Sequence, residues 1–555
     1  MPALDYLVIL VFALMVLLVG LSFTRSGSSM KSYFAAGGNL PWWLSGLSLF
    51  MSFFSAGTFV VWGSIAYEHG LVAVSIQWMM GIGGLIIGFY IAPRWRRANI
   101  LTVGAYIGNR FGPFLKKFYS YVFLVLSFVT TGAFLYPVAK LFNVSTGFSI
   151  EGSIVILGLL VIAYTSAGGL WAVIVTDVLQ FVILFAAVFI VVPFAFSDVG
   201  GMGSFIEQSP DGFFGLISGE YTLGFLVAFL FYNTIFIGGN WAYVQRYTSV
   251  RSPQEAKKVG WLFGCLYFIS PILWMLPAMI YRSINPDLTG LENEGAFLLM
   301  CKAVLPTGLL GLMLGGMIFA TASSVNTTLN MSAAVFTNDL FKRLQSEVDD
   351  SRLMLVARVS TMVFGFITIG VALLVPAFGG IVEVVLSVGA ITGAPLFAPP
   401  IWALFSKRLS SFAILFTTLC SLSINLFFKF ISPWLLDLSL NRANEMLVGV
   451  LVPLGMLAVF EVLANSTRST AKTGSDETSS SEFESSPTTS DENAFALHVL
   501  GLALGFTGLL IIVLGWMGEK GKGMVMTVGV SIIALAAVLI QIASKRKGKG
   551  SEAGT

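Results

Sequence analysis

FFSAGTF, residues 53–59, places small and polar residues in the middle of a segment that is otherwise apolar enough to cross a membrane. A later apolar segment is interrupted in the same way at IGGNWAYVQRY, residues 237–247. An interruption of this kind frees backbone carbonyl groups, which in lipid must be satisfied by a partner or an ion. The two segments are the second and the seventh apolar segments of the chain, a spacing that fits two inverted repeats that each begin with a broken helix. Small residues in membrane helices also serve as plain packing surfaces, so the pattern alone leaves that alternative open.

The composition predicts an all-α integral membrane protein. Of the 555 residues 56% are hydrophobic and 11% are charged, and the mean hydropathy is +0.87. Apolar runs long enough to cross a hydrocarbon core of ~30 Å as helices number about fifteen. They lie near residues 5–24, 41–66, 70–92, 117–141, 150–168, 172–196, 220–246, 259–281, 302–337, 353–377, 380–405, 409–431, 444–464, 494–516 and 523–543.

Lysine and arginine set the expected orientation, because basic loops stay on the cytoplasmic side. Loops rich in these residues alternate with loops that have few of them. The basic loops contain Arg25 and Lys31; Arg94, Arg96, Arg97, Arg110, Lys116 and Lys117; Arg246, Arg251, Lys257 and Lys258; and Lys407 and Arg408. We therefore expect the N-terminus outside and the C-terminus, with the tail KRKGKG (545–550), in the cytoplasm of a multi-pass cell-membrane protein.

TASSVNTTLN, residues 321–330, puts seven hydroxyl or amide side chains into an apolar segment. On a helix the residues of one face are Ser323, Asn326, Thr327 and Asn330. Hydroxyls that bond back to their own helix, and amides that hold helices together, account for one or two such residues. An unsatisfied polar group in hydrocarbon costs several kcal/mol, so a dense stripe favours an ion site. Neutral oxygens suit sodium, because they replace its hydration shell without burying a charge.

Four stretches with unusual composition follow one another along the chain. They are YFAAGGNLPWWLSGLSLFMSFFSAGTF (33–59), YTSAGGLWAVIVTDVLQ (164–180), NWAYVQRYTSVRSPQEAKK (240–258) and ASSVNTTLNMSAAVFTNDLFKR (322–343). In these stretches the chain resembles the sodium:solute symporter family, which includes sodium/glucose, proline and sialic acid symporters. The resemblance extends from about residue 5 to about residue 465, and it implies the LeuT-type fold of two inverted five-helix repeats with extra flanking helices.

This resemblance and the hydropathy together divide the chain into six parts. We expect an N-terminal peripheral helix and loop (1–40), the first inverted repeat (41–200), the second inverted repeat (201–408), peripheral helices (409–465), a disordered cytoplasmic linker (466–493), and C-terminal helices with a basic tail (494–555). The linker is dominated by Ser, Thr, Asp and Glu, which bury too little apolar surface to order a chain. It is either a solvated tether or a site of regulatory phosphorylation.

The resemblance also implies a sodium site. Its oxygen ligands would be the carbonyl groups of Met51, Phe54 and Ala320 and the hydroxyl groups of Ser323 and Ser324.

Some family members have a second sodium site, and its positions here carry Asp177, Asn326 and Thr327. An asparagine and a threonine stand where two serines are expected, which puts a second ion in doubt. The alternative for Asp177 is a structural acid at the start of a helix.

For the solute, the resemblance implies an inner gate at Tyr243 that stacks under the bound molecule. The neutral hydrogen-bond partners would be Ser55, Thr58, Gln77 and Asn240.

Three further positions bear on the identity of the solute. Tyr267 stands in place of a lysine of the sugar-binding pattern, and Leu386 stands in place of a glutamine. Glu383 would pair with a cationic group if it faces the cavity, and is otherwise a solvated acid near the outer end of its helix. An anionic solute would favour an arginine in its site, and we expect no arginine inside any core span.

The predicted function is a sodium-coupled secondary active symporter that imports a small organic solute, a neutral polyhydroxylated molecule such as a sugar, by alternating access. Its partners would be the solute, Na+ and the lipid bilayer, with no nucleic acid. The alternatives are a sodium symporter for an amino acid or a carboxylate such as sialic acid, and a membrane sensor or scaffold that transports nothing. An enzyme is not expected, because the sequence contains no HExxH, no GxSxG with its partners and no metal cluster.

Overall fold

The fold was analysed in a computed structural model. The structure describes residues 1–23, 36–100, 102–342, 349–375, 381–466, 489–518 and 520–552. Within these ranges it describes the backbone alone at 37, 144, 164–169, 290–291, 350, 381–388, 390, 442, 465–466, 489–491 and 546–552. The expected linker therefore lies largely outside the described residues.

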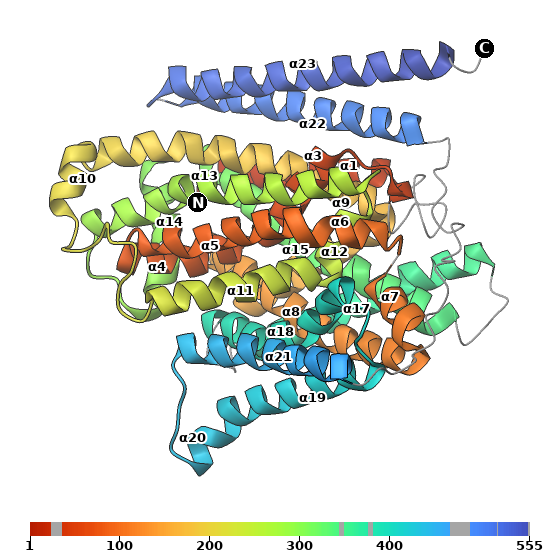
Figure 1. The fold of residues 1–555 in the computed structure, drawn as a ribbon. Coiled ribbons are helices and arrows are strands. Elements are labelled where there is room, and N and C mark those ends of the chain that lie inside the picture. The colour runs from red at the N-terminus through yellow and green to blue at the C-terminus, as the bar shows by residue number, and fades with distance from the viewer. Residues whose placement is uncertain are drawn as a thin grey trace.

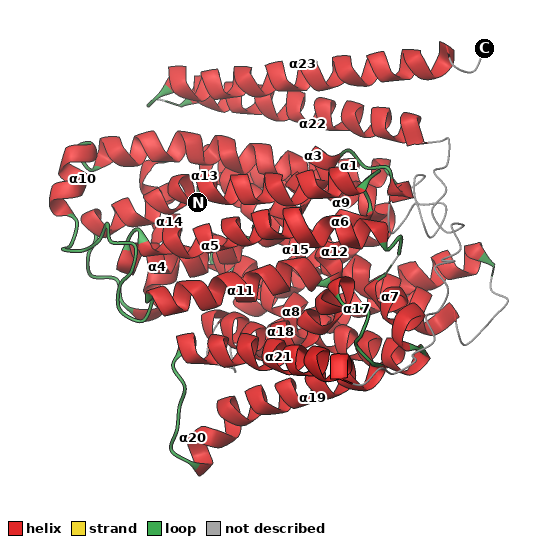
Figure 2. Ribbon diagram, viewed as in Figure 1, coloured by secondary structure: helices red, strands yellow, loops and turns green. Residues whose placement is uncertain are grey.

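The described residues form helices joined by loops and include no strand (Figure 2). The helices of the first half are α1 (Ala3–Ser22), η1 (Ala36–Gly38), α3 (Trp42–Phe53), η2 (Thr58–Trp62), α4 (Gly63–His69), α5 (Val72–Ile86), η3 (Ile87–Ile91), α6 (Ala92–Arg97), α7 (Val103–Phe111), α8 (Pro113–Thr146), α9 (Ile150–Asp198), α10 (Met202–Gln208), α11 (Leu223–Gly239), α12 (Trp241–Thr248) and α13 (Pro253–Ile284). They continue with η4 (Gly290–Gly295), α14 (Ala296–Val304), α15 (Leu309–Ala334), η5 (Val335–Phe341), α17 (Asp350–Leu374), α18 (Ile381–Phe405), α19 (Ser411–Leu426), η7 (Phe427–Ile431), α20 (Ser432–Leu435), α21 (Arg442–Ser466), α22 (Thr489–Met517) and α23 (Lys522–Glu552).

The helices account for the expected membrane spans. Among the described residues 11 helices are long and apolar enough to cross a membrane, or up to 13 if each of two bent pairs is one span. Two shorter apolar helices, Ile150–Ala163 and Ile391–Phe405, fall in the remaining expected ranges. The all-α membrane fold predicted from the sequence is confirmed.

Both interruptions quoted above are breaks in helices. Trp42–Phe53 meets Thr58–His69 at 60°, and Leu223–Gly239 meets Trp241–Thr248 at 63°. The first pair begins the expected first repeat and the second pair begins the expected second repeat. The nearly equal bends agree with the inverted-repeat fold, in which a broken helix from each repeat borders the central site.

Helix α15 lies in the centre of the bundle (Figure 1). All of its side chains from Leu309 to Ala334 are buried, and it packs against α1, α3, α8, α9 and α17. The hairpin of α22 and α23 forms an outer layer along one side, against α9, and α19 and α21 lie along the opposite side (Figure 1). The polar stripe of α15 therefore faces protein and not lipid.

The sequence predicts two separate spans at 150–168 and 172–196. Both are parts of one continuous helix, α9, of 49 residues, so the expected interruption between them is wrong. A continuous ladder of backbone hydrogen bonds leaves no polar group open at membrane depth, which is the reason that small residues alone do not end a membrane helix. Asp177 consequently lies well inside α9, and the alternative that it is an acid at a helix start is also wrong.

The N-terminal end of α15 is held by a side chain from another helix. The Oδ1 atom of Asp5 on α1 accepts hydrogen bonds from the backbone N–H groups of Gly308 and Gly311 at 2.6 and 2.9 Å. Gly308 has φ +88°, a conformation that favours glycine, and no side chain of its own caps this end of α15. Asp5 is 1% exposed. The carboxylate therefore caps α15 in place of a local cap and favours the positive end of the helix dipole.

We predict that Asp5→Ala lowers the free energy of unfolding by about 1–3 kcal/mol, because it leaves two buried N–H groups without an acceptor. Asp5→Asn retains an acceptor oxygen, so it should have a smaller effect. Thermal unfolding of the purified protein in detergent measures both, with Asp198→Ala as a control at an exposed aspartate. Equal stability of Asp5→Ala and the parent protein would contradict the capping role.

Candidate functional site between the two broken helices

The first break is closed by hydroxyl groups. After Phe53 the chain is extended at Phe54, with φ −94° and ψ 111°, and helical structure resumes at Ala56. The Thr58 hydroxyl accepts a hydrogen bond from the N–H of Ser55 at 3.1 Å and donates to the carbonyl of Phe53 at 3.2 Å. Thr58 therefore supplies hydrogen-bond partners for backbone groups on both sides of the interruption.

Helix α15 also contributes to this closure. Its Thr321 hydroxyl accepts a hydrogen bond from the N–H of Ala56 at 2.7 Å. In the last turn of α3, the carbonyl of Ser52 accepts a hydrogen bond from the Ser324 hydroxyl at 3.1 Å. The hydroxyl stripe predicted from the sequence is thus packed against the end of α3.

These contacts bring together the two segments that carry the predicted sodium ligands. Met51 and Phe54 flank the end of α3, and Ala320, Ser323 and Ser324 lie on the facing turn of α15. The carbonyl of Met51 accepts a hydrogen bond from the N–H of Phe54 at 3.1 Å. Neutral carbonyl and hydroxyl oxygens gathered at a break in a helix are the donor set that fits a small hard cation.

Next to this position lies a buried ionic cluster. The carboxylate of Asp177 on α9 accepts hydrogen bonds from the hydroxyls of Ser48 on α3 and Ser323 on α15. The guanidinium of Arg246 on α12 lies 4.0 Å from the same carboxylate, and both side chains are fully buried. Arg246 also donates to the hydroxyl of Thr327 at 2.8 Å.

The position of Arg246 corrects an expectation from the sequence. We expected this residue in a cytoplasmic loop and no arginine inside a core span, but Arg246 lies in α12 and is buried between helices. Hydropathy assigns Arg246 to a loop because the residue lies at the edge of an apolar segment. The signal that could have found it is Asp177, since an acid inside an apolar helix requires a partner.

Two of the three residues predicted for a second sodium site contact an arginine. Asp177 and Thr327 both interact with Arg246, whereas both polar atoms of the Asn326 side chain are buried and have no hydrogen-bond partner among the described residues. A fixed positive charge beside the carboxylate disfavours a cation at the same place.

A cavity of about 160 Å³, here called the larger cavity, lies between the broken helices. The residues predicted to bind the solute that line it are Ser55, Thr58, Tyr243 and Tyr267. Its other polar lining residues, which the sequence analysis did not identify, are Thr130, Tyr232, Asn233 and Thr392. The aromatic and large apolar lining residues are Phe53, Val61, Trp62, Met80, Val129, Phe134, Phe229 and Phe236. None of the described side chains in this lining is charged.

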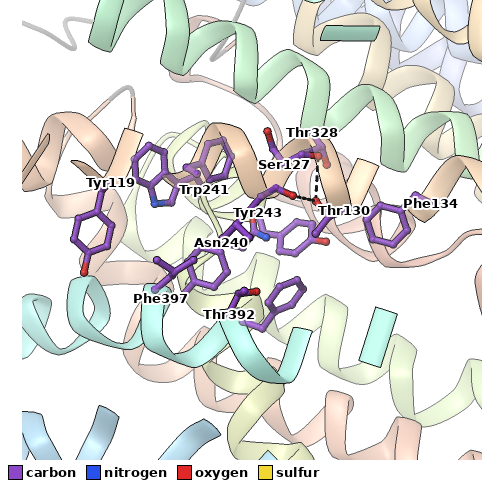
Figure 3. Close-up of a pocket in the computed structure, with 14 residues that line it drawn as sticks. Tyr119, Ser127, Thr130, Phe134, Asn240, Trp241, Tyr243, Thr328, Thr392 and Phe397 are labelled. Atoms are coloured by element: carbon purple, nitrogen blue, oxygen red, sulfur yellow. Dashed lines mark hydrogen bonds between the residues drawn. The ribbon is translucent and has the colours of Figure 1, made fainter. Parts of the chain in front are cut away.

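A smaller cavity of about 40 Å³ lies nearer the basic end of α8, where it is lined by Tyr119 and Phe123. Figure 3 shows the hydroxyl groups of Ser127, Thr130 and Thr328 on one side of the view and the side chains of Thr392 and Phe397 on the other. Asn240 and Tyr243 of the second broken helix also line it. Tyr243 therefore borders both cavities, and its ring lies 4.2 Å from the ring of Phe53, centroid to centroid.

The remaining predicted residues lie elsewhere or outside the description. Asn240 is the extended residue between α11 and α12, and its side chain caps α12 by accepting from the N–H of Ala242 at 3.0 Å. Gln77 is buried on α5, donates to the carbonyl of Ala73 at 3.2 Å and lines neither cavity. The side chains of Glu383 and Leu386 lie outside the part of α18 whose side chains the structure describes.

Comparison with known proteins now identifies the family. The family model described as the sodium:solute symporter family matches residues 33–419. The chain belongs to the sodium:solute symporter family. The resemblance predicted from four short stretches is therefore confirmed, and the protein is a member of a family of membrane transporters.

Two known proteins and one solved structure are similar to this sodium:solute symporter family member. It is 28% identical over 496 residues to a sodium/glucose cotransporter of Vibrio parahaemolyticus, covering 82% of this chain and 89% of the relative. It is 27% identical over 461 residues to solute carrier family 5 member 4B of Mus musculus, covering 74% and 69%. A solved Na+-coupled sialic acid symporter in a substrate-bound outward-open state has a TM-score of 0.72 at 23% identity, covering 84% and 98%. That likeness is one of fold, and it agrees with the LeuT-type repeats.

We predict that replacing both Ser323 and Ser324 by alanine abolishes sodium-stimulated uptake in proteoliposomes while the protein remains folded. Two of about five oxygen ligands would be lost, and the remaining ones cannot compensate for dehydration of the ion. The matched control is Ser421→Ala, a buried serine on α19 that bonds only to its own helix in the described contacts apart from a sulfur contact to Met456. Unchanged sodium dependence in the double variant would rule out these two ligands.

Proposed function

We propose that the protein is a sodium-coupled symporter that imports a neutral, polyhydroxylated solute such as a sugar by alternating access. The observation that carries this proposal is the larger cavity, which lies between the two broken helices and combines neutral hydrogen-bond groups with aromatic faces. Sodium would bind at the end of α3 through Met51, Phe54, Ala320, Ser323 and Ser324, next to the solute.

The polar groups of the larger cavity suit hydroxyl groups. The Ser55 hydroxyl and the Asn233 amide offer both donors and acceptors, which pair with solute hydroxyls that also donate and accept. Asn233 donates one N–H to the carbonyl of Phe229, which leaves its second N–H and its oxygen for the solute. Such a site discriminates against molecules that leave its buried polar groups unpaired. The ring of Tyr243 offers a flat apolar face to the C–H side of a sugar ring.

A charged solute has less support. A carboxylate would favour an arginine in its site, and the buried Arg246 is already engaged by Asp177 and Thr327. The relative named as a sodium/glucose cotransporter, which is 28% identical to this chain, supports a sugar.

For transport, Tyr243 would act as the inner gate. It borders the larger cavity, and the smaller cavity lies beyond it toward the basic end of the bundle. The basic loops support an arrangement with that end in the cytoplasm and the N-terminus outside. Movement of Tyr243 would then join the two cavities and release the solute inward.

We predict that one sodium ion is transported per cycle, with a hyperbolic dependence of uptake on sodium and a Hill coefficient of about 1, because cooperativity requires more than one site. Arg246 already supplies a positive charge beside Asp177, so a second cation is not needed there. Initial uptake rates at varied sodium concentration test this. A sigmoidal curve that becomes hyperbolic in Asp177→Asn would instead assign a second ion to Asp177.

We predict that neutral sugars, in the presence of sodium, raise the melting temperature of the purified protein, whereas amino acids and carboxylates do not. Asn233→Leu should weaken the effective sugar by about 5- to 150-fold, the range that corresponds to losing one buried hydrogen bond of about 1–3 kcal/mol. Asn493→Leu, at a buried asparagine of α22 outside both cavities, is the matched control.

Glu383→Gln should leave the response to sugar unchanged. If an amine or an amino acid stabilises the protein, and that stabilisation disappears in Glu383→Gln, the solute is cationic or zwitterionic and the sugar proposal is wrong.

A further inference from the structure

Arg246 connects four helices through one buried guanidinium. Its Nε atom donates to the hydroxyl of Ser48 on α3 at 3.1 Å, and its two terminal nitrogens donate to Gln245 and to Thr327 on α15, both at 2.8 Å. The carboxylate of Asp177 on α9 is 4.0 Å away. The backbone carbonyl of Arg246 also accepts from the hydroxyl of Ser45 at 2.8 Å. Arginine suits such a junction because its planar fork donates in several fixed directions.

A buried ion pair is a poor source of net stability, because removing two charges from water is costly. Its clearer effect is to disfavour other arrangements of the helices, since separating the pair would leave an uncompensated charge inside the protein. A junction of this kind therefore favours one arrangement of its helices over others.

The arrangement that Arg246 favours concerns the inner gate. Arg246 lies one helical turn after Tyr243 on α12, so the two residues move together. Helix α12 is joined to α11 through the extended residue Asn240, with a bend of 63° between the two helices. A short helix that follows a non-helical residue can rotate without breaking its own hydrogen bonds, so contacts such as those of Arg246 decide its position.

The same carboxylate also reaches the proposed sodium site. Asp177 accepts hydrogen bonds from Ser48, the partner of Arg246, and from Ser323, a proposed ligand of sodium. A hydroxyl that binds a cation through its oxygen points its proton away from the ion. Sodium at Ser323 would therefore favour donation from Ser323 to Asp177 over a hydrogen bond back to its own helix.

We propose that the Arg246–Asp177 pair is a latch that holds α12 and Tyr243 against α3, α9 and α15, and that sodium at Ser323 keeps this latch closed. Arg246 is a positioning residue in this scheme, since it touches neither the ion nor the solute. The link to sodium rests on the proposed function, whereas the link between Arg246 and the position of α12 does not.

The latch is tested by the accessibility of the smaller cavity. Leu396 of α18 lines that cavity and is 3% exposed. Leu396→Cys is introduced after Cys265, Cys301 and Cys420 have been replaced by serine, and its reaction with a small maleimide is timed in the full-length purified protein, with and without sodium and without solute. The parent should react slowly in sodium and faster without it.

Arg246→Gln should react at least about tenfold faster in sodium and lose the sodium effect, because the contacts of a buried charge pair are coupled and are lost together. Arg246→Lys, which retains the charge without the fork, should lie between the parent and Arg246→Gln. Arg251→Gln, at an exposed arginine shortly after α12, should react like the parent.

A second variant covers the case in which Arg246→Gln fails to fold with Asp177 left unpaired. Asp177→Asn combined with Arg246→Gln removes both charges, and it should also react fast whether or not sodium is present. If the folded variants react as slowly as the parent in sodium, the latch is overturned even where sodium still protects the parent. If they react fast but sodium has no effect on the parent, the latch stands and its link to sodium, together with the proposed sodium site, is overturned.

Discussion

A polypeptide in hydrocarbon must satisfy its backbone hydrogen bonds internally, and the structure of this protein depends on how it does so at two broken helices. At the first break the hydroxyls of Thr58 and Thr321 bond to backbone groups on both sides of the interruption. At the second break Asn240 caps α12 with its own side chain. Because such breaks are tolerated only inside protein, the helices around them form a continuous wall, and the space between the breaks becomes the site.

The buried acidic side chains also find their partners on other helices. Asp5 caps α15 from another helix, Asp177 pairs with Arg246, and Asp339 at the basic end accepts from Lys116 at 2.8 Å and from Thr102. Each of these acids joins segments that are far apart in the sequence. The central helix α15 is thereby fixed at its first turn and, through Ser323 and Thr327, near its middle. This gives the sodium ligands proposed for α15 a rigid support.

The cavities are neutral although ionic groups lie close to them. Tyr243 borders both cavities, and Arg246 follows it one turn later on α12. Arg246 and Asp177 line neither cavity, and in the proposed scheme their charges position the gate and do not contact the solute. This separation of neutral recognition from ionic positioning fits a family that couples a solute to an ion, and it explains how an arginine is present in the core without indicating an anionic solute.

The membrane class, most of the span ranges, the two breaks and the polar face of α15 could be predicted from the sequence alone. These features follow from local hydropathy and from helical periodicity, which depend on neighbouring residues only. Four short motifs were enough to predict the family. Only the folded structure shows that Arg246 lies against Asp177, that Asp5 caps α15, that Gln77 lines neither cavity, and that Tyr232 and Asn233 line the larger one. Contacts of this kind join helices that are distant along the chain, and a single sequence does not record which faces of two helices meet.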